Sequence, residues 1–177
     1  ATNLRIFNVE ELVTHGGSLR VYGCHVDDIR KTQGSVSLLL QEEKERGLQD
    51  LKTYQDLQKR ADKIKNDLVT FLTEQKKGGK KVVAYGAAAK GNTLLNYAGI
   101  KTDLLPFVFD LAKAKQGCFM PGSHIPILSP EYLIESKPDY ILILPWNIAA
   151  EVRKQNSTLE KNGLKFITAV PSLTILN

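Results

Sequence analysis

The segment YGAAAKGNT combines small residues and one lysine in a pattern typical of turns that bind anions. Gly86 ends an apolar run, and Gly91 lies five positions later at the expected start of a helix. Backbone N–H groups and the helix dipole attract negative charge at such a turn, and Lys90 would add a cation. A Walker loop requires lysine where Asn92 stands, and the G-x-G-x-x-G fingerprint requires glycine where Ala88 stands. The segment therefore predicts either a phosphate site or a tight turn whose small residues serve packing.

Further polar residues follow the second expected strand. Asp110 ends that strand, in the position of the acidic residue that binds ribose in dinucleotide sites. The loop KQGCFMPGSHIPIL comes next and carries Lys115, Gln116, Ser123 and His124. This loop is either a ligand loop or an ordinary turn with a solvated histidine.

The segment LPWNIAAE follows the fourth expected strand and contains the only tryptophan of the chain. Trp146 would either stack on a base or sugar or close the core. Asn147 would either contact a ligand or cap the helix that follows. Both residues are therefore candidates for substrate binding, with a structural alternative for each.

No catalytic constellation is present in the sequence. His15, His25 and His124 lie in separate segments, without an H-E-x-x-H or G-x-S-x-G motif. Cys24 and Cys118 are far apart and form no C-x-x-C pair, so neither a zinc site nor a disulfide framework is expected. We therefore assign no catalytic residue and no metal ligand in this chain.

The composition is that of a globular protein. The 177 residues include 42% hydrophobic residues and carry a formal net charge of +5. There is no apolar run of the ~18–20 residues that a membrane span requires, and the segment ATNLRIFNVEEL does not have the layout of a signal peptide. Like charges form no block, so a nucleic-acid partner is not expected. A cytoplasmic location and no membrane association are the expectations.

The elements that must position these residues fall into three parts. Residues 1–27 predict a β-hairpin whose turn contains His15 and the two following glycines, and two strands alone are only marginally stable. Residues 28–79 predict a helical lead-in: an amphipathic helix at 35–47, then one from Asp50 to about Lys77 with an apolar stripe. Residues 80–177 alternate between apolar strands and helices. Strands are expected at 81–87, 106–110, 125–128, 139–145 and 164–171, and helices at 90–98, 130–135 and 149–162.

This alternation predicts an α/β fold, a Rossmann-like doubly wound and mostly parallel sheet. Its ligand crevice is expected beyond the carboxyl ends of the strands. The candidate residues named above all follow expected strands or lie between them.

Four segments in order, THGGSLRVY, AYGAAAKGNTLLNYAGI, KQG-x-x-x-PGSHIPI and KPDYILILPWN, resemble the C-terminal part of the sugar C-methyltransferase family. Enzymes of this family use S-adenosylmethionine to methylate a carbon of a nucleotide-linked, typically dTDP-linked, deoxysugar. They have an N-terminal zinc-binding module, a central methyltransferase domain and a C-terminal Rossmann-like domain that helps to hold the nucleotide-sugar. The resemblance spans nearly the whole chain.

The resemblance implies a division of roles. Residues 1–27 correspond to the last strands of the methyltransferase domain, which explains the hairpin. S-adenosylmethionine and a structural zinc are expected in the full-length protein, and no cofactor in this chain. The family's acid–base segment precedes THGGSLRVY and is absent, so the chain alone is expected to be non-catalytic.

The family's nucleotide-sugar site also maps onto this sequence. The resemblance places seven residues at or near that site: Gly86, Lys90, Gly91, Asn92, His124, Trp146 and Asn147. The expected partners are a nucleotide-linked sugar and the missing N-terminal methyltransferase domain. This chain departs from the family at one place, since it lacks the Asn-Pro that usually follows Asp110. No family role is therefore transferred to residues 111–114.

Two other functions remain open. One is an NAD(P)-binding Rossmann module of an oxidoreductase, supported by Gly86, Gly91 and Asp110 but weakened by Ala88. The other is a structural or dimerisation domain, in which the apolar-striped helix forms a homodimer contact.

Overall fold

The computed structural model describes residues 2–14, 17–161 and 163–176. The chain divides into two compact units, Ala1–Gln58 and Lys59–Asn177, and each is described by itself. Among the described residues, no helix has both the length and the apolar character needed to cross a membrane.

The first unit contains the predicted hairpin. Strands β1 (Leu4–Leu12) and β2 (Ser18–His25) pair antiparallel. His15 and Gly16 of the predicted turn lie outside the described residues. Helix α1 (Gly34–Glu45) packs on β1, where the Ser35 hydroxyl donates to Asn8 Oδ1 at 2.8 Å.

The second unit is built on a six-stranded sheet with the order β5-β4-β3-β6-β7-β8. Its strands are β3 (Val82–Tyr85), β4 (Val108–Phe109), β5 (Ile127–Leu128), β6 (Tyr140–Ile143), β7 (Lys165–Thr168) and β8 (Thr174–Leu176). All pairs are parallel except β7 with β8. This is the strand order 3-2-1-4-5-6 of doubly wound folds, so the predicted α/β class with a mostly parallel sheet is confirmed.

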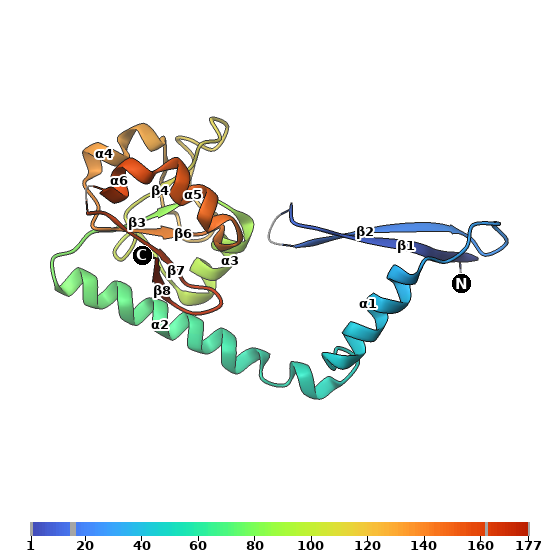
Figure 1. The fold of residues 1–177 in the computed structure, drawn as a ribbon. Helices are drawn as coiled ribbons and strands as arrows, with labels where there is room; N and C mark the ends of the chain where they lie inside the picture. Colours follow the sequence, from blue (N-terminus) through green and yellow to red (C-terminus); the bar gives the residue numbers. More distant parts are fainter. Residues whose placement is uncertain (1, 15–16, 162, 177) are drawn as a thin grey trace. The chain divides into compact units, whose positions relative to one another are not determined.

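Helices cover both faces of this sheet (Figure 1). They are α2 (Leu57–Lys77), α3 (Ala89–Ala98), α4 (Leu133–Ser136), α5 (Ala149–Gln155) and α6 (Ser157–Lys161). Side chains from α2 and α3 join one buried cluster with Val82 and Ala84. Side chains from α4 and α5, with Leu159 of α6, join the other cluster with Val83 and Tyr85. Because β3 is buried on both faces, its sequence is continuously apolar.

The helix predicted from Asp50 to Lys77 is interrupted. A 3₁₀ turn, η2 (Leu51–Tyr54), precedes α2, and residues 55 and 56 separate the two. The second half of the apolar stripe is buried, with Leu68 and Leu72 packed in the core of the second unit. Most of α2 therefore belongs to that unit, whereas the sequence boundary at residue 80 leaves it in the lead-in.

The C-terminal part differs from its prediction in two ways. The helix predicted at 149–162 is two helices, because the backbone leaves the helical conformation at Asn156 (φ −112°, ψ 21°), whose side chain donates to the Val152 carbonyl at 2.8 Å. The Asn156 side chain also hydrogen-bonds the Tyr85 hydroxyl. Burial raises the pKa of this hydroxyl, and the hydrogen bond with Asn156 acts in the opposite direction. The antiparallel edge strand β8 was not predicted, since its three residues carry too short an apolar pattern.

Asp139 joins the amino ends of β3 and β6 and provides a test of this part of the fold. Its carboxylate accepts 2.8 Å bonds from Lys80 Nζ and from the Lys81 backbone N–H. Together these hold the pKa of Asp139 below its ordinary 3.8. Because this carboxyl has a lower pKa in the folded state than in the unfolded state, it stabilises the protein at every pH above the unfolded-state pKa. This stabilisation is lost as the pH falls through the folded-state pKa.

We expect Asp139→Asn to lower the free energy of unfolding by about 1 kcal/mol at neutral pH. The difference from the unmodified chain should narrow between about pH 5 and about pH 3. The difference in unfolding free energy is measured by urea unfolding, followed by Trp146 fluorescence, at neutral pH and at about pH 3. The exposed Asp103→Asn is the charge-matched control. An unchanged difference at low pH would contradict the stabilising role of the ionised Asp139 carboxylate.

Candidate functional site

The strand order reverses between β3 and β6, so the carboxyl ends of these two strands form the switch point of the sheet. Gly86 and Gly91 allow close packing there. Gly86 has φ +86°, and a Cβ on it would lie 2.5 Å from Pro145 Cδ. A Cβ on Gly91 would lie 2.5 Å from Leu144 Cβ. Both glycines therefore fit the turn and α3 against the end of β6, which is the packing alternative of the sequence analysis.

Three predicted residues meet at the switch point. The ammonium group of Lys90, in the first turn of α3, donates to Asn147 Oδ1 at 3.1 Å. The same nitrogen lies 5.6 Å from the centre of the Trp146 ring, within cation–π range. We call Lys90, Trp146 and Asn147 the switch-point cluster. Asn147 is not the helix cap that its position suggested, since the residue before α5 is Ile148 and makes no side-chain cap.

Lys90 lies at an electrostatically unfavourable position. The amino end of α3 has no side-chain cap and no acidic residue in its first turn. The partial positive charge at this helix end repels a lysine and attracts an anion. An anion bound here would gain from the helix end and from Lys90 together.

Asp110 forms a closed network between the ends of β3 and β4. Its carboxylate accepts the Ala87 backbone N–H at 2.7 Å and the Ala112 N–H at 2.8 Å. Lys115 Nζ lies 3.0 Å from the same carboxylate and donates to the Ala87 carbonyl. Gln116 Nε2 donates to the Asp110 carbonyl at 2.9 Å. Asp110 is 7% exposed, so its carboxylate serves the two turns and is not presented to a ribose.

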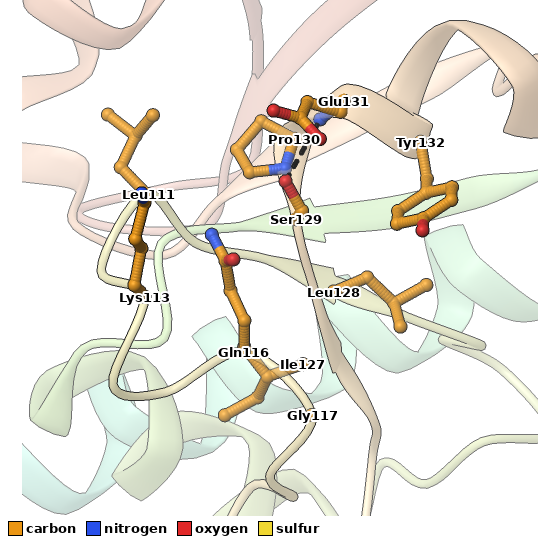
Figure 2. A pocket seen from close by; sticks show the side chains of 10 residues that line it. All are labelled: Leu111, Lys113, Gln116, Gly117, Ile127, Leu128, Ser129, Pro130, Glu131 and Tyr132. Carbon is orange, nitrogen blue, oxygen red and sulfur yellow. Dashed lines mark hydrogen bonds between the residues drawn. The ribbon is translucent and has the colours of Figure 1, made fainter.

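A pocket of about 760 Å³ opens beyond the carboxyl ends of β4 and β5. Figure 2 shows the amide of Gln116 between Leu111 on one side and Ser129 on the other, with the ring of Tyr132 beyond Leu128. We call this space the β4–β5 pocket. It lies at the same edge of the sheet as the switch-point cluster, because β3, β4, β5 and β6 are parallel.

His124 lies apart from the switch-point cluster. It sits at the tip of a loop whose two sides pair antiparallel through Phe119 and Pro126, so the loop runs back toward the amino end of β5. This tip packs on the last turn of α3, where Asn96 Nδ2 donates to the Pro121 carbonyl at 2.9 Å. His124 is exposed, and its role in ligand binding stays a prediction.

Asn92 and Ser123 face inward. Asn92 Oδ1 and the Ser123 hydroxyl are both buried, and neither has a hydrogen-bond partner among the residues that the structure describes. The oxygen of Asn92 is thus not presented at the open surface of the switch point.

The residues that line the β4–β5 pocket were mostly missed by sequence reasoning. The family resemblance has no carry-over at residues 111–114, and Ser129 and Tyr132 belong to an inconspicuous segment. A signal was present nonetheless, since both groups directly follow expected strands at the ligand-binding edge of an α/β sheet.

No metal site is assigned. Within residues 2–14, 17–161 and 163–176, no three His, Cys, Asp or Glu side chains are grouped so that they could hold a metal ion. The described residues therefore offer no group that fits a structural zinc.

A family model described as the C-methyltransferase C-terminal domain matches residues 13–171. The C-methyltransferase NovU of Streptomyces niveus is 32% identical over 174 residues, which are 98% of this chain and 41% of that relative. The chain thus spans less than half the length of this curated relative. Among solved structures, UDP-D-quinovosamine 4-dehydrogenase from Vibrio fischeri aligns with a TM-score of 0.44 and 20% identity, over 55% of this chain and 93% of that one.

Proposed function

The chain belongs to the C-methyltransferase C-terminal domain family, and from this membership we propose that it is the nucleotide-sugar-binding portion of an S-adenosylmethionine-dependent C-methyltransferase. The proposed substrate is a nucleotide-linked, typically dTDP-linked, deoxysugar. The proposed task of this chain is to bind and orient that substrate.

One observation carries the proposal: the switch-point cluster at the uncapped end of α3. A diphosphate is a compact dianion that several N–H groups can bind at once. The first turn of α3 supplies such groups, and Lys90 supplies a mobile cation beside them. The exposed ammonium needs to move only from Asn147 to a phosphate oxygen.

The methyl-transfer chemistry is assigned to other parts of the protein. S-adenosylmethionine, when bound, supplies the methyl group, and we propose that both it and a structural zinc belong to domains outside this chain. Residues 1–27 are proposed to complete the sheet of the methyltransferase domain. In support, β1 and β2 form a sheet of only two strands among the described residues, which is marginal by itself.

The geometry gives less support to an NAD(P) module. A dinucleotide site of this fold uses a free acidic side chain at the end of the second strand to bind the ribose hydroxyls. Here the Asp110 carboxylate already accepts two backbone N–H groups and pairs with Lys115. A 2′-deoxyribose has no 2′-hydroxyl for such an acid to bind, which is compatible with a dTDP ligand.

The test is Lys90→Ala, with Lys101→Ala as the control. Lys101 is exposed just beyond the other end of α3, so both variants lose one positive charge from the same region. We expect dTDP to bind the unmodified chain and Lys90→Ala to weaken binding at least tenfold, because a charge-assisted contact contributes about 1.5–3 kcal/mol. Lys101→Ala should bind dTDP nearly as the unmodified chain does. Isothermal titration calorimetry measures all three.

Two further titrations separate the alternatives. We expect no binding of S-adenosylmethionine, and weaker binding of NAD than of dTDP. Tighter binding of NAD would overturn the proposal in favour of an oxidoreductase module. No binding of any of the three compounds would favour a structural role.

A further inference from the structure

We propose that the β4–β5 pocket holds the base of the nucleotide, while the diphosphate lies at the switch-point cluster. This inference rests on the proposed function, and it fixes the direction in which the nucleotide-sugar lies along the edge of the sheet. The sugar end then points away from β5, toward the Trp146 side of the switch point.

The position of the pocket supports this direction. Two hydrogen bonds connect the phosphate turn to the pocket: the Ala87 N–H donates to the Asp110 carboxylate, and Gln116 donates to the Asp110 carbonyl. The Asp110 network thus forms a short, rigid floor between the two sites. A nucleoside joined to a phosphate at the switch point would cross this floor and reach the pocket.

The chemistry of the pocket suits a base better than a phosphate. Leu111 and Tyr132 are 61% and 55% exposed, so an apolar and an aromatic surface flank the space without being covered. Glu131 and Lys113 both line the pocket, so one carboxylate and one ammonium offset each other and the lining offers no net positive charge for a diphosphate. The volume of about 760 Å³ lies within the range of small-molecule sites, about 300–1,000 Å³.

Gln116 provides a polar contact of the kind a base requires. Its Nε2 uses one hydrogen in the bond to Asp110, and its Oε1 accepts no hydrogen bond from the described residues. The amide therefore retains one donor and one acceptor, which match the carbonyl and imide N–H edge of a thymine or uracil ring. Because Gln116 is held by Asp110, its amide is oriented before a ligand binds.

Trp146 is less suited to the base. The Lys90 ammonium already lies over its ring, and the residue is half-buried. A base stacked on the ring would compete with the cation that the diphosphate needs. Trp146 is instead a fluorescent reporter of binding at the switch-point cluster, since it is the single tryptophan of the chain.

The experiment separates the two halves of the ligand. Thymidine and inorganic pyrophosphate are titrated individually into the ¹⁵N-labelled chain. We expect thymidine to shift the backbone amides of Gln116, Gly117 and Ser129 and to leave those of Ala89 and Lys90 in place. Pyrophosphate should produce the opposite pattern and change the Trp146 fluorescence.

Variants provide the second readout. Leu111→Ala combined with Tyr132→Ala removes the apolar flanks, and we expect the dissociation constant of dTDP to rise about tenfold while that of pyrophosphate is unchanged. Ile134→Ala is the control, since Ile134 is 72% exposed nearby but outside the pocket.

The outcomes are distinguishable. The proposed direction would be overturned if thymidine changed the chemical shifts of Trp146 and not those of the pocket residues. It would also be overturned if the double variant bound dTDP as tightly as the unmodified chain. Either result would leave the proposed function standing. Failure of dTDP and pyrophosphate to bind at all would overturn both.

Discussion

Gly86→Ala is expected to lower the free energy of unfolding by about 2–5 kcal/mol, because two separate costs coincide at this position. The backbone has φ +86°, a conformation that residues with a Cβ rarely adopt. The new Cβ would also lie 2.5 Å and 2.7 Å from Pro145 Cδ and Cγ. Since these atoms belong to a rigid ring, the ring cannot turn aside as a flexible side chain would. Urea unfolding followed by Trp146 fluorescence reports on this unit.

Two comparisons divide the cost of Gly86→Ala. Gly99 has φ +67° but no atom within 4 Å of its added Cβ, so Gly99→Ala should show only the backbone cost of about 1–2 kcal/mol. Adding Pro145→Ala to Gly86→Ala removes the ring atoms and should recover about 1–3 kcal/mol. If Gly86→Ala and Gly99→Ala cost the same, the close approach of the turn to Pro145 is not a constraint.

Asp110→Ala is expected to destabilise the second unit by about 2–4 kcal/mol. The variant leaves the backbone N–H groups of Ala87 and Ala112 without their acceptor, and it leaves Lys115 without its partner. Both bonds are partly buried, and a donor shielded from water that loses its acceptor costs more than the hydrogen bond itself contributed. Chemical denaturation measures the total loss, and faster amide hydrogen exchange at Ala87 and Ala112 locates it.

The matched variant for Asp110 is Lys115→Ala. Lys115 is partly exposed, and its removal leaves both backbone N–H groups bonded to the carboxylate. The expected loss is about 1 kcal/mol or less. A cost for Lys115→Ala equal to that of Asp110→Ala would mean that the ion pair, and not the two backbone hydrogen bonds, supports the turns.

The fold class could be predicted because local patterns determine it. The apolar run at 82–85 reads as a strand buried on both faces, and the structure buries all four residues. The hairpin at 4–25 follows from β-branched and aromatic runs. Two departures in the C-terminal part have physical reasons: Asn156 breaks a helix through a local side-chain bond, and β8 is stabilised by pairing with β7 rather than by its own short pattern.

The candidate site was only partly predictable. The carboxyl-end rule selected Lys90, Trp146 and Asn147, and the structure brings these three together although 57 positions separate Lys90 from Asn147. The same reasoning grouped His124 with them, but the loop reverses and carries it toward the other end of α3. The roles of these residues in binding await the titrations described above.

The sequence by itself determined the alternation of strands and helices as far as β7, the family, and the small residues of the turn after β3, because these depend on residue type and spacing along the chain. The tertiary structure decided what those residues touch. It filled the space beside Gly86 and Gly91 with the two residues that follow β6, engaged Asp110 with backbone N–H groups, and joined Lys90 to Trp146 and Asn147. The physical reason is that such contacts depend on how parallel strands align at one edge of the sheet. The spacing of residues within one strand–turn–helix unit carries no information about which unit lies beside it.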